Sequence, residues 1–132
     1  MSTLIELEYE GGQKLHARLG PHLIRTDQPP EDGGEDTAPT PSDLFLASLV
    51  VCAGSYAYAF CQSRNLDTSK LRVRATCHYD EEKKRYTRIA TDLTLPPDFP
   101  ERYKRALVRS MDMCFVKKHL FHPPEFDIDA HY

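Results

Sequence analysis

The chain has 132 residues, with 17 Lys and Arg against 20 Asp and Glu, so its formal net charge at pH 7 is −3. This length predicts a single domain over residues 1–132 with one hydrophobic core. The acidic balance disfavours a nucleic-acid binder, because such proteins usually present a basic surface. The four cysteines lack the close spacing of a secreted disulfide framework. We therefore expect a cytoplasmic protein with reduced thiols and no signal peptide.

The first 26 residues predict an antiparallel meander of three strands. Polar and apolar residues alternate in part over residues 4–9, 14–19 and 22–26. Gly11-Gly12 and Gly20-Pro21 supply the turns. A loop rich in Pro, Gly and acidic residues follows over 27–39. Its composition favours a flexible surface connection, whereas its length of about 13 residues leaves a functional loop as the alternative.

A long helix is predicted from Thr40 to Arg64. Thr40 and Asp43 match a capping box, and Pro41 suits the first helical position. From Leu44 to Cys61 the chain carries no charge, and a helix that is apolar on every side is buried on every side or lies in lipid. Acidic rather than basic residues precede it, which favours a core helix over a membrane span. Such a surface is more than one small chain can cover, which indicates a dimer.

The remaining chain predicts a hairpin, a helix and a last strand. Residues 71–79 alternate strictly and return through a charged turn as a second strand over 86–95. Apolar residues at helical spacing predict a helix over 99–114, which itself or through a continuation runs to Leu120. Residues 125–130 alternate again and predict a final strand. This order of elements predicts an α+β domain with antiparallel sheet.

Two of the four cysteines are candidates for chemistry. Cys61 and Cys77 lie in apolar surroundings and are interpreted as small buried hydrophobic residues. Cys52 and Cys114 lie on two helices that can direct both thiols into one core, which would suit a redox pair, but spacing alone leaves that open. No metal or cofactor is expected: no Gly-rich phosphate loop follows a strand, and 114–122 lacks the paired cysteines of a structural zinc site.

The segment from Gly33-Gly34 through Pro39–Leu49 to Cys52 resembles the signature of the OsmC/Ohr family of osmotically induced and organic-hydroperoxide-resistance proteins. Cys114 resembles the second cysteine of that family. The resemblance implies antiparallel sheets wrapped around a long central helix, in an intertwined homodimer with active sites at the subunit interface. It also implies that Cys52 attacks an organic hydroperoxide as thiolate and that Cys114 resolves the resulting sulfenic acid as a disulfide, after which a thiol reductant closes the cycle.

Two positions depart from the peroxidase pattern of this family. Peroxidase members have a Glu ten residues before the first Cys, where this chain has Ser42 with Asp43 beside it. They also have an Arg in an N-terminal turn, and the matching turn here, residues 11–14, has none. We therefore take Arg25, and after it Arg18, as the candidate cation beside Cys52. Asp43 is either an acidic site residue or only a helix cap.

Two functions from different classes remain open. One is a stress-related thiol-dependent peroxidase that uses Cys52 and Cys114, and the retained cysteines favour it. The other is a non-catalytic or regulatory protein that binds a small apolar ligand at the dimer interface, and the missing Glu and Arg favour it. The expected partners are a second copy of the chain, a small organic hydroperoxide or apolar ligand, and a thiol reductant. Neither nucleic acid nor a membrane is expected.

Overall fold

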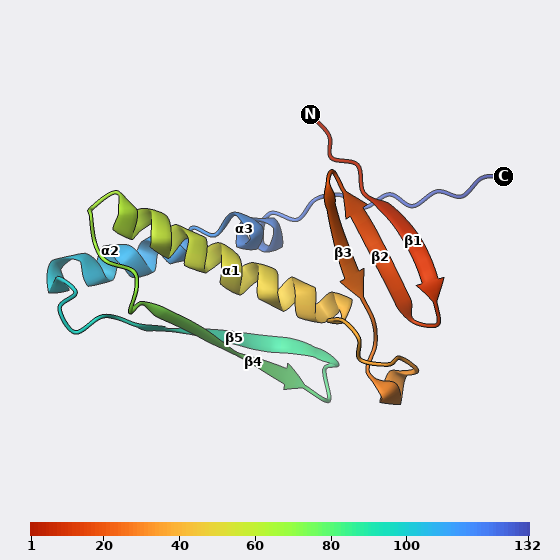
Figure 1. The fold of residues 1–132 in the computed structure, drawn as a ribbon, viewed down its shortest axis with the longest axis horizontal. Coiled ribbons are helices and arrows are strands. Elements are labelled where there is room, and N and C mark those ends of the chain that lie inside the picture. Colours follow the sequence, from red (N-terminus) through yellow and green to blue (C-terminus); the bar gives the residue numbers. More distant parts are fainter. The chain divides into compact units, whose positions relative to one another are not determined.

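The computed structural model describes residues 1–132, which form two compact units, Met1–Leu46 and Ala47–Tyr132 (Figure 1). The two sheets are antiparallel, and with three α-helices they give the α+β class that the order of elements predicts. Each unit is described by itself below. The single domain expected from the chain length stays a prediction.

The first unit holds a three-stranded sheet in the order β1–β2–β3. Its strands are β1 (Glu6–Gly11), β2 (Lys14–Leu19) and β3 (His22–Thr26). The predicted meander is therefore confirmed, with β1 beginning two residues later than expected. Leu7 pairs with Ala17, which pairs with Ile24, so the alternation of side chains gathers apolar residues on one face. Leu7 and Ile24 are exposed within the chain, so nothing in the single chain fully covers this face.

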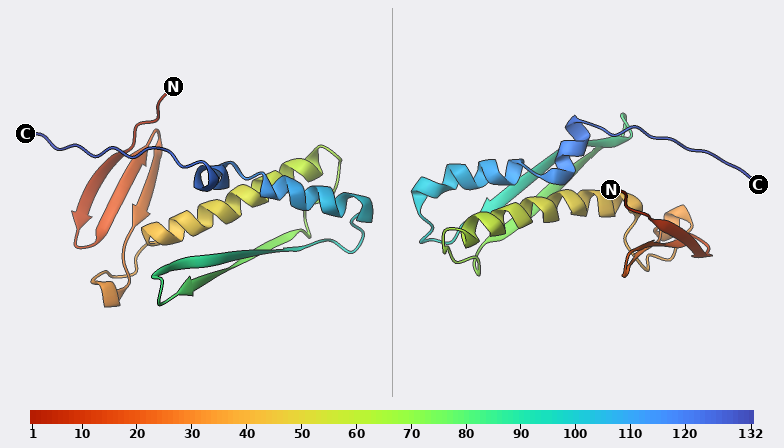
Figure 2. Two further views of the ribbon diagram at one scale, coloured as in Figure 1. Left: turned by 180° about the vertical axis from the view of Figure 1, so that it is seen from behind. Right: turned by 90° about the horizontal axis from the view of Figure 1, so that it is seen from above.

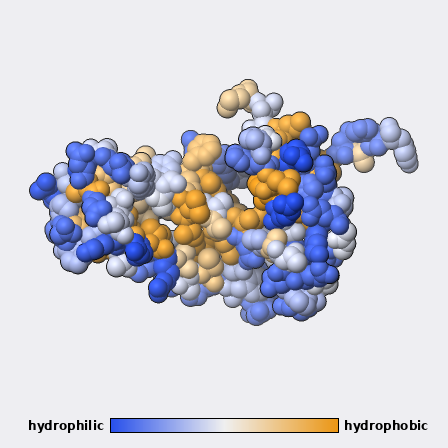
Figure 3. Space-filling view, in the orientation of Figure 1, coloured by the Kyte–Doolittle hydropathy of each residue, from blue (hydrophilic) through white to orange (hydrophobic).

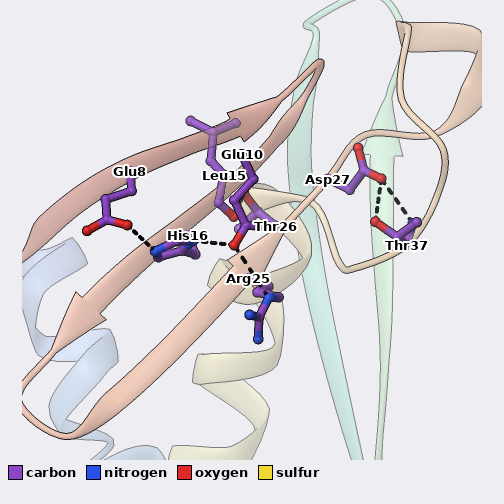
Figure 4. A network of polar contacts seen from close by, with 8 residues as sticks. All are labelled: Glu8, Glu10, Leu15, His16, Arg25, Thr26, Asp27 and Thr37. Carbon is purple, nitrogen blue, oxygen red and sulfur yellow. Dashed lines mark hydrogen bonds and ion pairs between the residues drawn. The ribbon is translucent and has the colours of Figure 1, made fainter.

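The opposite face of this sheet carries a polar network (Figure 4). The ring of His16 is buried, and the carboxylates of Glu8 and Glu10 contact its two nitrogens. The Glu8 contact to Nε2 measures 2.9 Å. Glu10 also lies 3.6 Å from Nε of Arg25. Three strands are thus joined by one chain of polar contacts, and Arg25 is engaged in it.

The loop between β3 and the first helix is organised by one carboxylate. Asp27 is only 1% exposed and accepts hydrogen bonds from the hydroxyl of Thr37 at 2.6 Å and from the backbone N–H groups of Thr37, Gln28 and Glu35 (Figure 4). The Thr37 hydroxyl is the largest of the causes that lower the pKa of Asp27 to about 2. The loop is therefore a folded element, and the prediction of a flexible connection is wrong.

The same loop explains the Gly33-Gly34 pair. A short 3₁₀ helix, η1 (Pro30–Asp32), ends at Gly33, whose φ of 87° lies in the left-handed region that favours glycine. A Cβ on Gly34 would lie 1.9 Å from the backbone oxygen of Gln28. The close approach of these two backbone segments thus requires glycine at position 34.

Helix α1 (Pro41–Gln62) begins with the predicted capping box. The N–H of Thr40 donates to the carboxylate of Asp43 at 3.1 Å, and the N–H of Asp43 donates to the hydroxyl of Thr40 at 3.1 Å. The helix ends two residues before the expected Arg64. Length and composition alone would let α1 cross a membrane, a test that the core helix of a soluble protein also passes.

In the second unit, α1 and α2 lie side by side along a β-hairpin (Figures 1 and 2). The elements are β4 (Arg72–Asp80), β5 (Arg85–Thr94), α2 (Glu101–Asp112) and α3 (Phe115–Phe121). The core joins the helices through Ala57, Phe60, Cys61, Leu107 and Met111. Half-buried residues of the hairpin, among them Val73 and Leu93, pack against this cluster. The helices and the hairpin thus share one hydrophobic core, as the amphipathic patterns predict.

The structure differs from two of the predictions for the C-terminal part of the chain. The predicted second helix is interrupted at Met113 and Cys114, so α3 is the continuation and runs in a new direction (Figure 1). The predicted strand over 125–130 is wrong: residues 123–132 have no regular secondary structure. Phe126 and Ile128 of this segment are exposed. Alternation alone does not make a strand, because its backbone groups need a neighbouring strand as partner.

Replacing Thr37 with Val should reduce stability in a pH-dependent way. The pKa of Asp27 is lowered from its ordinary 3.8 to about 2, so the ionised carboxylate stabilises the fold above pH 4, and this contribution is lost as pH falls through 2. Without the Thr37 hydroxyl the folded pKa moves back toward 3.8. Urea unfolding should therefore show a deficit for Thr37→Val at pH 7 that shrinks toward pH 2. Thr37→Ser retains the hydroxyl and is the matched control; an equal deficit at both pH values would contradict this account.

Candidate active site

Cys52 and Cys114 come together in the second unit. Cys52 lies midway along α1 and is half-buried, whereas Cys114 is buried at the break between α2 and α3. The two thiols lie close enough to affect each other's pKa, and they are not joined as a disulfide. That these two cysteines form a redox pair stays a prediction.

Cys114 also begins helix α3. Its backbone at φ −49° and ψ 121° is non-helical, and its sulfur accepts a hydrogen bond from the N–H of Lys117 at 3.4 Å. This is the role of an N-cap residue, which satisfies a free amide of the first helical turn. The break between α2 and α3 therefore places the first amides of α3 beside both sulfurs.

The surroundings of the two thiols shift their pKa values in opposite directions. The backbone N–H of Val116 is the main cause that lowers the pKa of Cys52, with smaller contributions from Cys114 and the N–H of Phe115, and burial opposes them. Burial, as the largest cause, raises the pKa of Cys114. Of the pair, Cys52 is thus the more acidic thiol. This division suits a nucleophile and a second thiol.

A cavity of about 420 Å³ opens beside Cys114. Its apolar wall comes from α1, β5, α2 and α3, and Cys114 is part of its lining; the other apolar residues are Leu49, Val50, Ala53, Ile89, Leu93, Val108, Met111 and Leu120. Arg109, Asp112 and Lys117 add charge to the lining. The volume lies within the range of small-molecule sites, about 300–1,000 Å³. An apolar molecule bound here would lie next to the buried thiol.

The remaining predicted site residues lie in the first unit. Asp43 caps helix α1, which is one of the two roles that the sequence predicts for it. Arg25 pairs with Glu10, and Arg18 is exposed on β2. A role for Arg25 or Asp43 at the thiols stays a prediction. The causes that lower the pKa of Cys52 are groups of the second unit, namely backbone amides and the Cys114 thiol.

Sequence reasoning did not find the backbone amides of Phe115 and Val116. It sought a cationic side chain, whereas the groups that stabilise the Cys52 thiolate here are main-chain donors. The sequence does not reveal the break between α2 and α3, because the amphipathic pattern continues through Cys114 without a proline. The charged side chains of Arg109 and Lys117 also belong to the cavity lining, which the helical pattern of the sequence does not reveal.

The family model of OsmC-like proteins matches residues 33–129, so the chain belongs to the OsmC-like family. The matched segment includes both cysteines and the two glycines of the Asp27 loop. The resemblance of the sequence to this family is therefore confirmed. No curated protein sequence matches the chain.

Solved structures of this family share the fold. A protein from Psychrobacter arcticus, described as a putative osmotic stress induced and detoxification response protein, is 20% identical with a TM-score of 0.76, over 89% of this chain and 87% of its own. An OsmC-like protein from Mycoplasma pneumoniae is 13% identical with a TM-score of 0.72, over 93% and 89%. A putative organic hydroperoxide resistance protein from Vibrio cholerae, with captopril bound in one of its active sites, is 16% identical with a TM-score of 0.57, over 88% and 83%.

Cys52 should be the most reactive of the core thiols at neutral pH. Its pKa is lowered, whereas burial raises the pKa of Cys114 and of Cys61, so Cys52 has the larger thiolate fraction. Alkylation by isotope-labelled iodoacetamide, read by mass spectrometry at each cysteine, should label Cys52 several times faster at pH 7. The same measurement in 8 M urea is the control, because the difference should vanish in the unfolded chain. Equal rates in the native protein would contradict the assignment.

Proposed function

We propose that this protein reduces organic hydroperoxides with thiols, using Cys52 as the nucleophile and Cys114 as the resolving residue. One observation carries the proposal: a half-buried thiol whose pKa is lowered lies next to a second, buried thiol that lines an apolar cavity. Membership of the OsmC-like family supports it, since relatives with the same fold include proteins described as organic hydroperoxide resistance proteins.

The first step is attack of the Cys52 thiolate on the terminal oxygen of ROOH. An S–O bond forms, the O–O bond breaks, and the alkoxide takes up a proton and leaves as ROH, so that Cys52 becomes a sulfenic acid. The N–H groups of Val116 and Phe115 hold the thiolate before the attack. They stabilise the negative charge without a side-chain cation.

The second step is condensation of Cys114 with the sulfenic acid. The Cys114 sulfur attacks the Cys52 sulfur, the S–O bond breaks, and water leaves as the disulfide forms. Cys114 lies close enough to Cys52 for each to affect the pKa of the other, so the resolving thiol is next to its target before oxidation. An external dithiol then reduces the disulfide by exchange, and is itself oxidised to a disulfide.

Cysteine variants test this cycle. Cys52→Ser should abolish peroxide-dependent oxidation of a dithiol such as dihydrolipoamide, with a loss of at least about 100-fold, because the nucleophile is gone. Cys114→Ser should still consume one equivalent of peroxide and accumulate a sulfenic acid on Cys52, detected by mass spectrometry after reaction with dimedone.

Cys61→Ala and Cys77→Ala are the matched controls, and both should retain turnover. Folding is checked for every variant by circular dichroism. Full turnover by Cys52→Ser would overturn the proposal, as would a Cys114→Ser protein in which Cys52 never becomes a sulfenic acid.

The alternative function is binding of a small apolar ligand without turnover, as a regulatory protein. The cavity favours it, because its wall is mostly aliphatic and its volume suits a small molecule. The two functions differ in one measurement: saturable ligand binding by wild-type protein that consumes no peroxide would favour the binding protein.

We also propose that the active unit is a homodimer. Along α1, Val51 is 67% and Tyr58 is 55% exposed, and these positions form one side of the helix together with Ala47 and Ser55. Hydrophobic side chains gather over the middle of α1 in Figure 3. The sheet of the first unit leaves a second apolar face open at Leu7 and Tyr9. Burial of such surfaces is the main driving force of obligate association.

Replacing Val51 with Glu should weaken that dimer. An unpaired carboxylate would be buried in each copy of the interface, so the dissociation constant should rise by at least about 100-fold. Sedimentation velocity at micromolar concentration measures the change, and Thr87→Glu, on an exposed position of β5, is the control with the same added charge. A wild-type protein that sediments as a monomer would contradict the proposed dimer.

A further inference from the structure

An ion pair spans the break between α2 and α3. The carboxylate of Asp112, the last residue of α2, contacts Nζ of Lys117, the third residue of α3. In a continuous α-helix, residues five apart point about 140° away from each other, so they are not neighbours on its surface. The pair therefore requires the break at Met113 and Cys114. It favours the broken conformation over the straight helix that the amphipathic pattern of the sequence would also allow.

The two helices themselves do not account for this pair. A helix dipole favours basic residues at the C-terminal end and acidic residues at the N-terminal end. Asp112 is an acid at the end of α2, and Lys117 is a base in the first turn of α3. Each charge thus lies where its own helix disfavours it. What the pair stabilises is the arrangement of the two helix ends relative to each other.

Lys117 is also connected to both thiols through the backbone. Its own N–H donates to Sγ of Cys114 at 3.4 Å. The preceding residue, Val116, supplies the N–H that is the main cause of the lowered pKa of Cys52. A displacement of this first turn of α3 from the end of α2 would therefore change the contacts of both sulfurs.

We propose that Asp112 and Lys117 are positioning residues, whose ion pair holds the break in the conformation that places Cys114 beside Cys52. The proposal rests on the proposed function in one respect: attack of Cys114 on the Cys52 sulfur is the resolving step of that cycle. The pair acts through the backbone of the break and takes no part in the chemistry at sulfur. Because 76% of the Asp112 side chain is exposed, loss of the pair should slow this attack by only about two- to fivefold.

The test measures the attack of Cys114 on Cys52 without peroxide. In a Cys61→Ala/Cys77→Ala background, dithiobis(nitrobenzoate) converts the Cys52 thiol to a mixed disulfide and releases one thionitrobenzoate. Cys114 then attacks the Cys52 sulfur, the mixed S–S bond breaks, and a second thionitrobenzoate leaves while the Cys114 proton passes to solvent. The absorbance of thionitrobenzoate follows both phases, and Cys114→Ser should lack the second.

Asp112→Asn is the decisive variant and should slow the second phase by about two- to fivefold. Removal of a negative charge near the thiols would by itself favour the Cys114 thiolate and speed this phase, so a slower phase reports lost positioning. Asp112→Glu retains the carboxylate and should restore the wild-type rate. Lys117→Gln should slow the phase at least as much as Asp112→Asn. In 0.5 M NaCl the difference between wild type and Asp112→Asn should shrink, because salt screens the pair.

Lys118→Gln and Glu101→Gln are the matched controls. Both residues are exposed, lie on α3 and α2 respectively, and take no part in the ion pair across the break. Both variants should retain the wild-type second phase, and urea unfolding checks that every variant is folded. The proposal is overturned if Asp112→Asn leaves the second phase unchanged or makes it faster, or if Lys118→Gln slows it as much as Lys117→Gln does.

The outcome for the peroxidase is read separately. A slower second phase in Asp112→Asn, in a protein whose wild type reduces no hydroperoxide, would leave the positioning pair standing and remove the proposed function. Hydroperoxide reduction by the wild type, with an unchanged second phase in Asp112→Asn, would do the reverse. The two failures are therefore distinguishable.

Discussion

The break between α2 and α3 at Cys114 is the constraint on which the candidate site depends. An uninterrupted helix would satisfy the N–H of Lys117 with a backbone carbonyl four residues earlier. Because the chain breaks, that N–H turns to the sulfur of Cys114, and the N–H groups of Val116 and Phe115 reach Cys52. One change in backbone direction thus positions the second thiol and supplies the donors for the first. The apolar wall of the cavity continues from α2 into α3 across the same break.

Main-chain donors have a physical advantage over a cationic side chain at this place. Cys52 is half-buried, and burial by itself favours the neutral thiol. A Lys or Arg would have to be desolvated to reach it, whereas the amides at a helix start are fixed in place by the backbone and lack intrahelical partners. A family member without the usual Arg can therefore still lower the pKa of its first cysteine. This consideration weakens the argument from the missing Arg against peroxide chemistry.

Sequence patterns predicted those parts of the fold that local rules determine. The capping box of Thr40 and Asp43, the three-stranded meander and the hairpin each follow from residues close in the chain. The folded loop around Asp27 was missed because its carboxylate binds amides up to ten residues away, and composition carries no sign of that. The break at Cys114 was missed because the amphipathic pattern runs through it. The 125–130 segment was misassigned because alternation does not reveal whether a partner strand exists.

The uncovered apolar surfaces and the activated thiol pair are connected through α1. The same helix presents Val51 on its exposed side and Cys52 toward α3, one residue apart and about 100° around the axis. In the proposed dimer, the partner would cover the side of α1 that lies next to Cys52 and so would restrict water near its thiol. Lower local hydration strengthens the interactions of Val116 and Phe115 with the thiolate, since electrostatic interactions increase as the effective dielectric constant falls, but it also disfavours the charged thiolate itself. Association and thiol reactivity would then be coupled, so that the monomer and the assembled form differ in the pKa of Cys52 even if their folds are identical.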